Sequence, residues 1–197
     1  MFDMFKNTTS DLKPLPEIIQ TKRLLLRQYK LEDVDDILAY ANNPDWSRFL
    51  PVPCPYERQH AIDFINAKLA LDPLKNSSFA IVFENKVAGG LDVRFDFNDC
   101  RAELGYSINP SIWGRGLVTE AAQKVIDLSF YIYPEISRFT ATAAAENVSS
   151  LRVMEKLGMI KEGYLRQHQK VRGKFLDIVC CGILREEWEA GREKRIA

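Results

Sequence analysis

The stretch from residue 101 to residue 130 constrains the fold most, because its hydrophobic period changes in the middle. Residues 101–108 alternate between apolar and other side chains, which predicts a β-strand. After the turn-forming Asn109-Pro110 and Gly114-Arg115-Gly116, apolar residues recur at the spacing of one helix face. A strand, a glycine turn and an amphipathic helix in direct succession predict a sheet with a helix packed against it. The apolar side of the strand is Ala102, Leu104, Tyr106 and Ile108, and that of the helix is Val118, Ala121, Val125 and Leu128.

The remaining segments extend this pattern to a mixed chain of the order β-α-α-β-β-β-α-β-α-β-β. Further strands are predicted over residues 21–29, 79–83, 87–97, 138–145, 160–171 and 175–184. Further helices are predicted from Leu31 to the stop at Asn43-Pro44, from after Pro55 to Leu69, and from Asn147 to Gly158. On the helix after the glycine turn, Glu120 and Lys124 are spaced as an i,i+4 ion pair.

Length and composition set further limits. Residues 1–20 are polar and contain Pro14 and Pro16, so we expect a loose lead-in there and one domain over residues 21–190. The 197 residues carry 27 Lys+Arg and 27 Asp+Glu, a balance that argues against nucleic-acid binding through a broad basic surface. No apolar run approaches the ~20 residues of a membrane span. The N-terminus lacks the pattern of a secretory signal, so we expect a cytoplasmic protein.

A metal site is not expected. The four cysteines form no Cys-x-x-Cys pair, and the two histidines, His60 and His168, lie far apart without a partner at ligand spacing.

The glycine turn is the first candidate for chemistry. Glycines at 114 and 116 let backbone N–H groups face a ligand, and a helix N-terminus beside them favours an anion such as a diphosphate. The alternative is a tight turn with no ligand. The turn is not a P-loop, because Leu117 rather than Lys follows Gly116, and Thr119 stands where the dinucleotide fingerprint needs a small third residue.

Two segments carry a resemblance to a known family. ELGYSINPSIWGRGLVTEA, followed by ENVSSLRVMEKLGMIKEGYLR, resembles the GCN5-related N-acetyltransferases (GNAT), in the branch of the ribosomal-protein-alanine N-acetyltransferases. The resemblance implies an α/β (α+β) acyl-CoA N-acyltransferase fold. Its sheet is mixed, mostly antiparallel and six- to seven-stranded, with helices on both faces and a V-shaped splay between the strands 101–108 and 138–145. It also implies acetyl-CoA as co-substrate and direct attack by an amine in a ternary complex.

The resemblance also assigns roles to residues. The pantetheine arm of CoA would pair with the strand edge near Ile108 and bond Asn147, and Ser150 would give a proton to the leaving thiolate. Asn147 serves as a helix N-cap in either case, and the Ser150 hydroxyl could instead satisfy a free backbone N–H. The CoA diphosphate would lie on the backbone N–H groups of Trp113, Gly114, Arg115, Gly116, Leu117 and Val118.

Glu103 is the candidate base. An alkyl amine is mostly protonated at pH 7, and a carboxylate on the strand beside the acetyl group could remove that proton. The alternative for Glu103 is an ion pair with Arg101 or with a basic residue of a helix, and His168 is a second candidate. The sequence departs from the family at three positions, with Met154 in place of a tyrosine acid, Gln169 in place of a carboxylate, and Ser111 in place of Gln or Arg.

The leading functional hypothesis is acetylation of the N-terminal α-amino group of a protein. The alternatives are a small amine acceptor, such as a polyamine, an aminoglycoside or an amino-acid-like amine, and a non-catalytic module that binds acyl-CoA. The expected partners are acetyl-CoA and the amine, with neither nucleic acid nor membrane, and the chain is expected to be a monomer or homodimer.

Overall fold

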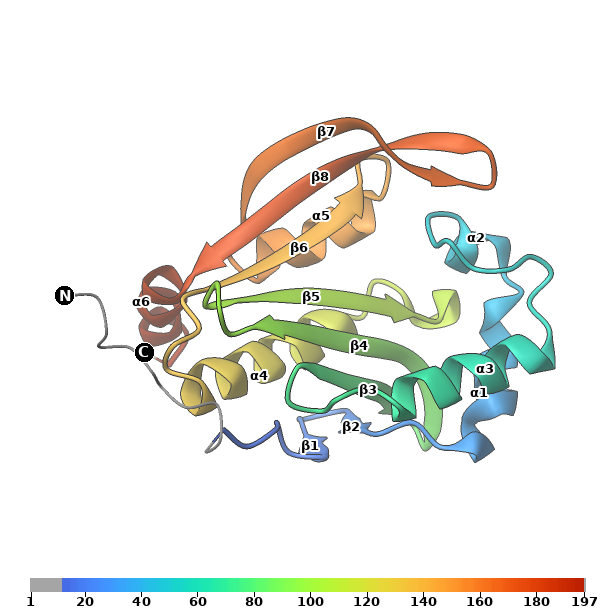
Figure 1. Cartoon of the computed structure of the whole chain (residues 1–197), viewed down its shortest axis with the longest axis horizontal. Helices are drawn as coiled ribbons and strands as arrows, with labels where there is room; N and C mark the ends of the chain where they lie inside the picture. The colour runs from blue at the N-terminus through green and yellow to red at the C-terminus, as the bar shows by residue number, and fades with distance from the viewer. Residues whose placement is uncertain (1–11, 197) are drawn as a thin grey trace.

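The computed structural model describes residues 12–196, and its centre is one eight-stranded sheet in the order β1-β2-β3-β4-β5-β6-β8-β7 (Figure 1). Neighbouring strands run antiparallel except β5 and β6, which are parallel. The strands are β1 (Ile18–Gln20), β2 (Leu25–Arg27), β3 (Asn76–Phe83), β4 (Lys86–Asp96), β5 (Arg101–Ile108), β6 (Arg138–Ala144), β7 (Ile160–Val171) and β8 (Lys174–Leu184). The prediction of a mixed, mostly antiparallel sheet is therefore confirmed.

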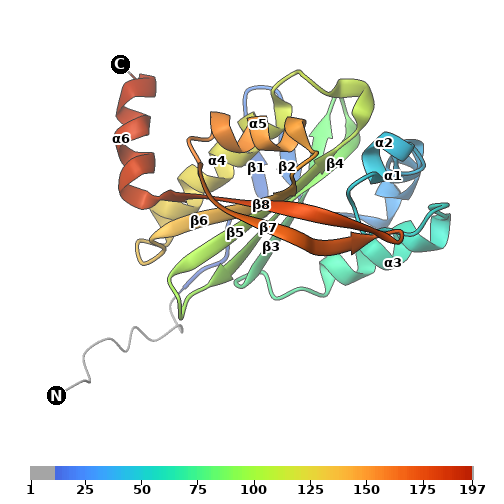
Figure 2. The same cartoon turned by 90° about the horizontal axis from the view of Figure 1, so that it is seen from above.

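Helices cover both faces of this sheet, with α4 and α5 on one face and α3 on the other (Figure 2). Two short 3₁₀ turns, at Leu31–Asp33 and Pro110–Ile112, precede α1 and the glycine turn. No helix in residues 12–196 is long and apolar enough to cross a membrane. The α-helices are α1 (Val34–Ala41), α2 (Pro44–Ser47), α3 (Arg58–Leu69), α4 (Leu117–Ile132), α5 (Val148–Lys156) and α6 (Arg185–Ile196).

The sheet has one strand more than the six to seven expected. Ile18–Gln20 forms β1 and pairs with β2, and Leu15 and Ile19 are buried in the core. The expected loose lead-in over residues 1–20 therefore differs from the structure in its last part, while residues 1–11 lie outside the described residues. The helices α2 and α6 were also not expected from the sequence.

Two apolar layers hold the helices to the sheet. The larger one lies under α4 and α5 and includes Val125, Phe139 and Met154, each at most 1% exposed. The smaller one joins α1 and α3 to β3 and β4 and includes Ile65 and Ala80. Burial of this apolar surface is the main force that fixes the helices on the sheet.

The parallel pairing of β5 with β6 is short, and this shapes the functional end of the molecule. It runs from Arg101↔Arg138 to Leu104↔Ala141 and then stops, although β5 continues to Ile108. The second half of β5 thus has a partner strand, β4, on one side only. This is the splay that the sequence resemblance implied.

The end of β5 lies unusually close to β4 at Gly89. A Cβ at this position would overlap the carbonyl oxygen of Ser107 and lie 2.8 Å from the Cα of Ile108. Because both obstacles are backbone atoms, a side chain here forces the two strands apart.

We predict that Gly89→Ala destabilises the protein by about 1–3 kcal/mol through this overpacking. Gly105→Ala on β5 is the matched control, because a Cβ there meets nothing within 4 Å. Urea unfolding of both variants tests the prediction, and equal stabilities would contradict it.

Candidate active site

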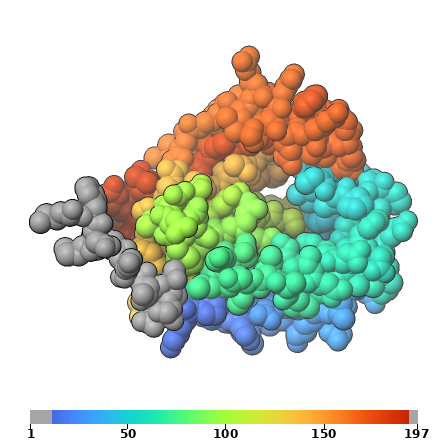
Figure 3. Space-filling view, viewed as in Figure 1, coloured from blue at the N-terminus to red at the C-terminus, as the bar shows by residue number. Residues whose placement is uncertain are grey.

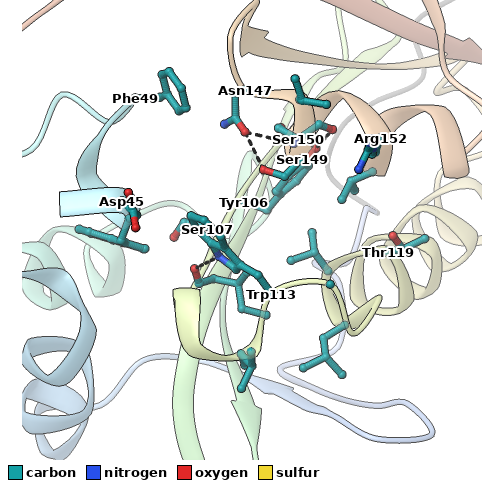
Figure 4. A pocket seen from close by; sticks show the side chains of 18 of the residues that line it. Asp45, Phe49, Tyr106, Ser107, Trp113, Thr119, Asn147, Ser149, Ser150 and Arg152 are labelled. Carbon is teal, nitrogen blue, oxygen red and sulfur yellow. Dashed lines mark hydrogen bonds between the residues drawn. The ribbon is translucent and has the colours of Figure 1, made fainter. Parts of the chain in front are cut away.

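The splay opens into a cavity of about 560 Å³. Its walls come from the end of β5, the glycine turn, the start of α4, α5 and the segment around α2. Figure 3 shows the surface hollowed between the β7–β8 arm and the segment of α2, and Figure 4 shows the lining side chains at close range. Three segments that are distant in sequence, residues 45–50, 106–119 and 146–156, thus meet at one site.

Most of the residues singled out in the sequence lie in the wall of this cavity. The structure brings together Ile108, Trp113, Gly114, Arg115, Gly116, Leu117, Val118, Asn147 and Ser150. Their roles toward a ligand stay predictions, because the structure tests where these residues are and not what they bind.

The glycine turn has a conformation that other residues rarely adopt. Gly114 and Gly116 have φ angles of 77° and 72°, and Gly116 is the N-cap of α4. Within residues 12–196, no acceptor bonds the backbone N–H groups of Gly114, Arg115 or Gly116. The Trp113 N–H is already used, because it donates to the carbonyl of Pro110. The turn therefore presents free donors beside a helix N-terminus, which is a suitable environment for an anion.

Arg23 fixes this turn in place. Its Nη1 donates to the carbonyl of Arg115 at 2.9 Å, and its Nε bonds Glu120 at 2.6 Å. Glu120 also accepts from Thr21 Oγ1 at 2.7 Å, and these bonds lower its pKa against the opposing effect of burial. The expected pairing of Glu120 with Lys124 is therefore replaced by a pairing with the segment before β2.

The open edge of β5 carries backbone groups that could pair with an extended ligand. Asn109 N–H donates to Ala88 of β4, so by strand alternation the backbone of Ile108 points to the other, open side. There the indole N–H of Trp113 donates to the Ile108 carbonyl at 2.9 Å. Trp113 thus holds the glycine turn against the end of the strand.

Asn147 and Ser150 meet at the start of α5. The Asn147 side chain is the N-cap, and its Oδ1 accepts from the Ser150 N–H at 3.2 Å and from Ser149 Oγ at 2.9 Å. The expected cap is confirmed. Its Nδ2 has no partner among the residues that the structure describes, so it can still donate to a ligand.

Tyr106 contacts Ser150 and was not recognised in the sequence as a site residue. Its hydroxyl donates to the Ser150 carbonyl at 3.0 Å and lies 2.9 Å from Ser150 Oγ. Burial raises the pKa of Tyr106 to about 12, against a lowering effect of the bond to Ser150. The alternation of side chains along residues 101–108 predicted that Tyr106 lies on the apolar side of the strand. It could not predict the gap between β5 and β6, through which the Tyr106 hydroxyl reaches α5.

Glu103, in contrast, is not part of the cavity wall. Its carboxylate forms an ion pair, but the partner is Arg94 on the neighbouring strand β4 at 2.7 Å, and not Arg101 or a helix residue as expected. His168 and Gln169 lie on β7, also outside the cavity lining. The assignment of a base to Glu103 stays a prediction.

Charged side chains divide the cavity into two ends. Three basic residues, Arg115, Arg152 and Lys156, line it at the glycine turn and α5. Asp45 of α2 lies at the opposite wall in Figure 4, facing Ser107 across the cavity. Spacing alone could have singled out Arg152 and Lys156, which are four residues apart on one helix face.

The β7–β8 hairpin is tied to α2 across the entrance. Arg172 at its tip donates through Nη1 to Ser47 Oγ at 3.2 Å and also bonds the Ser47 carbonyl. Beside it, Glu146 pairs with Lys174 at 2.9 Å and with Arg48 at 3.5 Å. These contacts hold α2 in place and close one side of the cavity.

The comparisons with known proteins agree with this site. Residues 23–160 match the family model described as "Acetyltransferase (GNAT) domain". The chain belongs to the GNAT family of N-acetyltransferases, so the resemblance in the sequence is confirmed.

The chain is similar to two curated proteins and to one solved structure that illustrate these comparisons. "Uncharacterized N-acetyltransferase p20" of Bacillus licheniformis is 31% identical over 176 residues, 87% of this chain and 98% of that protein. The "[Ribosomal protein uS5]-alanine N-acetyltransferase" of Escherichia coli is 32% identical over 100 residues, 51% of this chain and 50% of that enzyme. A structure of RimL, a ribosomal L7/L12 alpha-N-protein acetyltransferase in complex with coenzyme A, has a TM-score of 0.75 at 19% identity. It covers 85% of this chain and 98% of that one, and at this identity it shows the fold alone.

The buried Tyr106 hydroxyl leads to a prediction about alkaline stability. Between pH 10 and 12 the unfolded chain loses the Tyr106 proton while the folded chain keeps it, so stability falls as the pH rises. Tyr106→Phe removes this loss, and we expect the variant to lose about 1 kcal/mol less between pH 9.5 and 11. Urea unfolding at the two pH values measures it, and equal losses would show that the hydroxyl is not buried in solution.

Proposed function

We propose that the protein transfers the acetyl group of acetyl-CoA to the N-terminal α-amino group of a protein, by direct attack in a ternary complex. The observation that carries the proposal is the cavity at the splay, which joins free N–H donors and basic side chains at one end to an open strand edge. The name of the uS5-alanine relative supports the choice of acceptor.

For the donor, we propose that the diphosphate lies on the glycine turn and the start of α4. Arg152 and Lys156 face the same end and add positive charge for the phosphates of CoA. The pantetheine arm would then run along the open edge of β5 toward Asn147, whose Nδ2 can donate to one of its amide carbonyls. This course puts the thioester near Ser150 and Tyr106.

For the chemistry, we propose that the neutral amine attacks the thioester carbonyl carbon and the carbon–sulfur bond breaks. The sulfur leaves as a thiolate and takes the proton of Ser150 Oγ, and Ser150 recovers a proton from solvent. Tyr106 supports this step by its position, because its hydroxyl lies within hydrogen-bond distance of both the Ser150 carbonyl and Ser150 Oγ. When its single proton turns from the carbonyl to Ser150 Oγ, the serine proton is free to point to the sulfur. The amine's own proton goes to solvent, directly or through a base.

A small amine is the enzymatic alternative, and a module that binds acyl-CoA without turnover is the non-enzymatic one. Neither is favoured by a feature of the cavity. The proposal that the protein acts in the cytoplasm, as monomer or homodimer, rests on the sequence alone.

Acetylation of a peptide library with free N-termini tests the proposed acceptor. The purified protein should release CoA with a subset of peptides and modify their α-amino group, located by mass spectrometry. Turnover with polyamines or aminoglycosides but with no peptide would favour the small-amine alternative. Binding of acetyl-CoA without turnover of any amine would favour the module.

We predict that Gly114→Ala lowers acetyl-CoA affinity by at least tenfold, because the methyl group projects into the space of the diphosphate. Gly173→Ala in the β7–β8 turn is the matched control, with a φ of 81° against 77° at Gly114 and no atom within 4 Å of a Cβ at either position. Both variants carry the same backbone strain. Calorimetry with acetyl-CoA should separate them, and equal affinities would remove the turn from the donor site.

We predict that Ser150→Ala lowers kcat by ~10²-fold, the scale typical of a lost acid catalyst. The KM for acetyl-CoA should change much less, since the contact matters mainly in the transition state. Steady-state kinetics with a library-selected peptide measures both constants, and a melting curve controls for folding. An unchanged kcat would leave Ser150 as a helix-start hydroxyl, with water as the acid.

A further inference from the structure

We infer that Asp45 binds the protonated amine of the acceptor at the α2 end of the cavity, where the amine arrives as an ammonium ion and releases its proton to solvent before it attacks the thioester. The inference rests on the proposed function, since it assumes that an amine enters this cavity. It adds a residue for the recognition of the acceptor, which neither the sequence pattern nor the resemblance assigned.

The first observation is that Asp45 is the unpaired carboxylate of the cavity wall. Two acidic residues line the cavity, Asp45 and Glu146. Glu146 is neutralised by Lys174, whose hydrogen bond lowers its pKa, and by Arg48. The Asp45 carboxylate has neither an ion pair nor a hydrogen bond among residues 12–196. The Asp45 carboxylate therefore lines the cavity without an ion-pair partner among these residues, since Arg48 of the same segment pairs with Glu146.

The second observation is the separation of charge along the cavity. The basic side chains of Arg115, Arg152 and Lys156 are grouped at the glycine turn and α5, and Asp45 stands apart from them at α2. Arg48 also lines the α2 end, but its guanidinium pairs with Glu146. A donor with phosphates at the basic end leaves the far end for the acceptor. The acceptor brings a positive charge, so each substrate meets charge of opposite sign.

The third observation is that Asp45 is held in position by its backbone. Its N–H donates to the Asn43 side chain at 2.9 Å, and the Arg172 contacts fix Ser47 two residues on. Trp46 packs edge-on against Tyr40 with ring centroids 5.4 Å apart. A short side chain on a fixed backbone loses little freedom when it forms an ion pair.

Glu103 is less suited to this task. Its carboxylate already pairs with Arg94, and it lies outside the cavity wall. To bind an ammonium group it would first have to give up this partner. The same experiment can therefore compare the two carboxylates.

The test uses Asp45→Asn, which keeps the shape and removes the charge. The acceptors are an alanine-initiated tetrapeptide amide and spermidine, and the one that the unchanged protein acetylates more efficiently is carried forward. We expect the KM for this amine to rise about tenfold to hundredfold, as for the loss of a charged hydrogen bond. Acetyl-CoA affinity, measured by calorimetry, should stay within twofold.

Three further variants sharpen the result. Asp45→Glu keeps the charge and should restore most of the amine affinity. Glu103→Gln should leave the amine KM within about threefold, and Glu32→Gln, an exposed carboxylate outside the cavity, controls for net charge. Added salt should raise the KM of the unchanged protein more than that of Asp45→Asn, because screening acts on the ion pair.

The outcomes are distinct. A raised amine KM for Asp45→Asn with unchanged donor affinity supports the inference. An unchanged amine KM in a folded Asp45→Asn variant overturns it and leaves the proposed function intact. A large effect of Glu103→Gln alone would move the ammonium site to β5. If the unchanged protein acetylates neither these amines nor any library peptide, the proposed function fails, and this inference fails with it.

Discussion

The early end of the β5–β6 pairing is the constraint on which the site depends. Up to Leu104 the two strands share backbone hydrogen bonds, and beyond it each needs another partner. Polar backbone groups are costly to bury unpaired, so the gap must be filled by side chains, solvent or a ligand. Part of the gap is bridged by Tyr106, which reaches across to Ser150 on α5. The rest is the cavity, whose position therefore follows from the length of one parallel ladder.

The two ends of the cavity are fixed by different parts of the chain. At the glycine turn, Arg23 from the segment before β2 links the turn's backbone to Glu120 on the helix that follows. The α2 end depends on the distant β7–β8 hairpin, through Arg172 and Ser47. The proposed donor end is thus tied to α4 and to the segment before β2, and the proposed acceptor end to the last hairpin of the sheet.

The features that could be predicted from the sequence are those that depend on local patterns of residues. The strand 101–108 and the cap at Asn147 follow from alternation and from a side chain that bonds its own helix start, and both were found as expected. Register is not local, so an ion pair of Glu103 could be foreseen as one alternative, but its partner Arg94 could not. Asp45 lies in a helix of four residues, too short to show a period, and its position in the site depends on the whole fold.

The positive φ angles of Gly114 and Gly116 have a consequence for how this family can diversify. Binding of a ligand by main-chain N–H groups does not depend on the side chains of the residues that supply these groups or of their neighbours. In the proposed donor site, a position such as Ser111 is then free to change without loss of the donor, while the two glycines are not. The preference for an acceptor can therefore change through other residues of the cavity while the proposed contacts to the donor remain, because those contacts are made by the main chain and not by side chains.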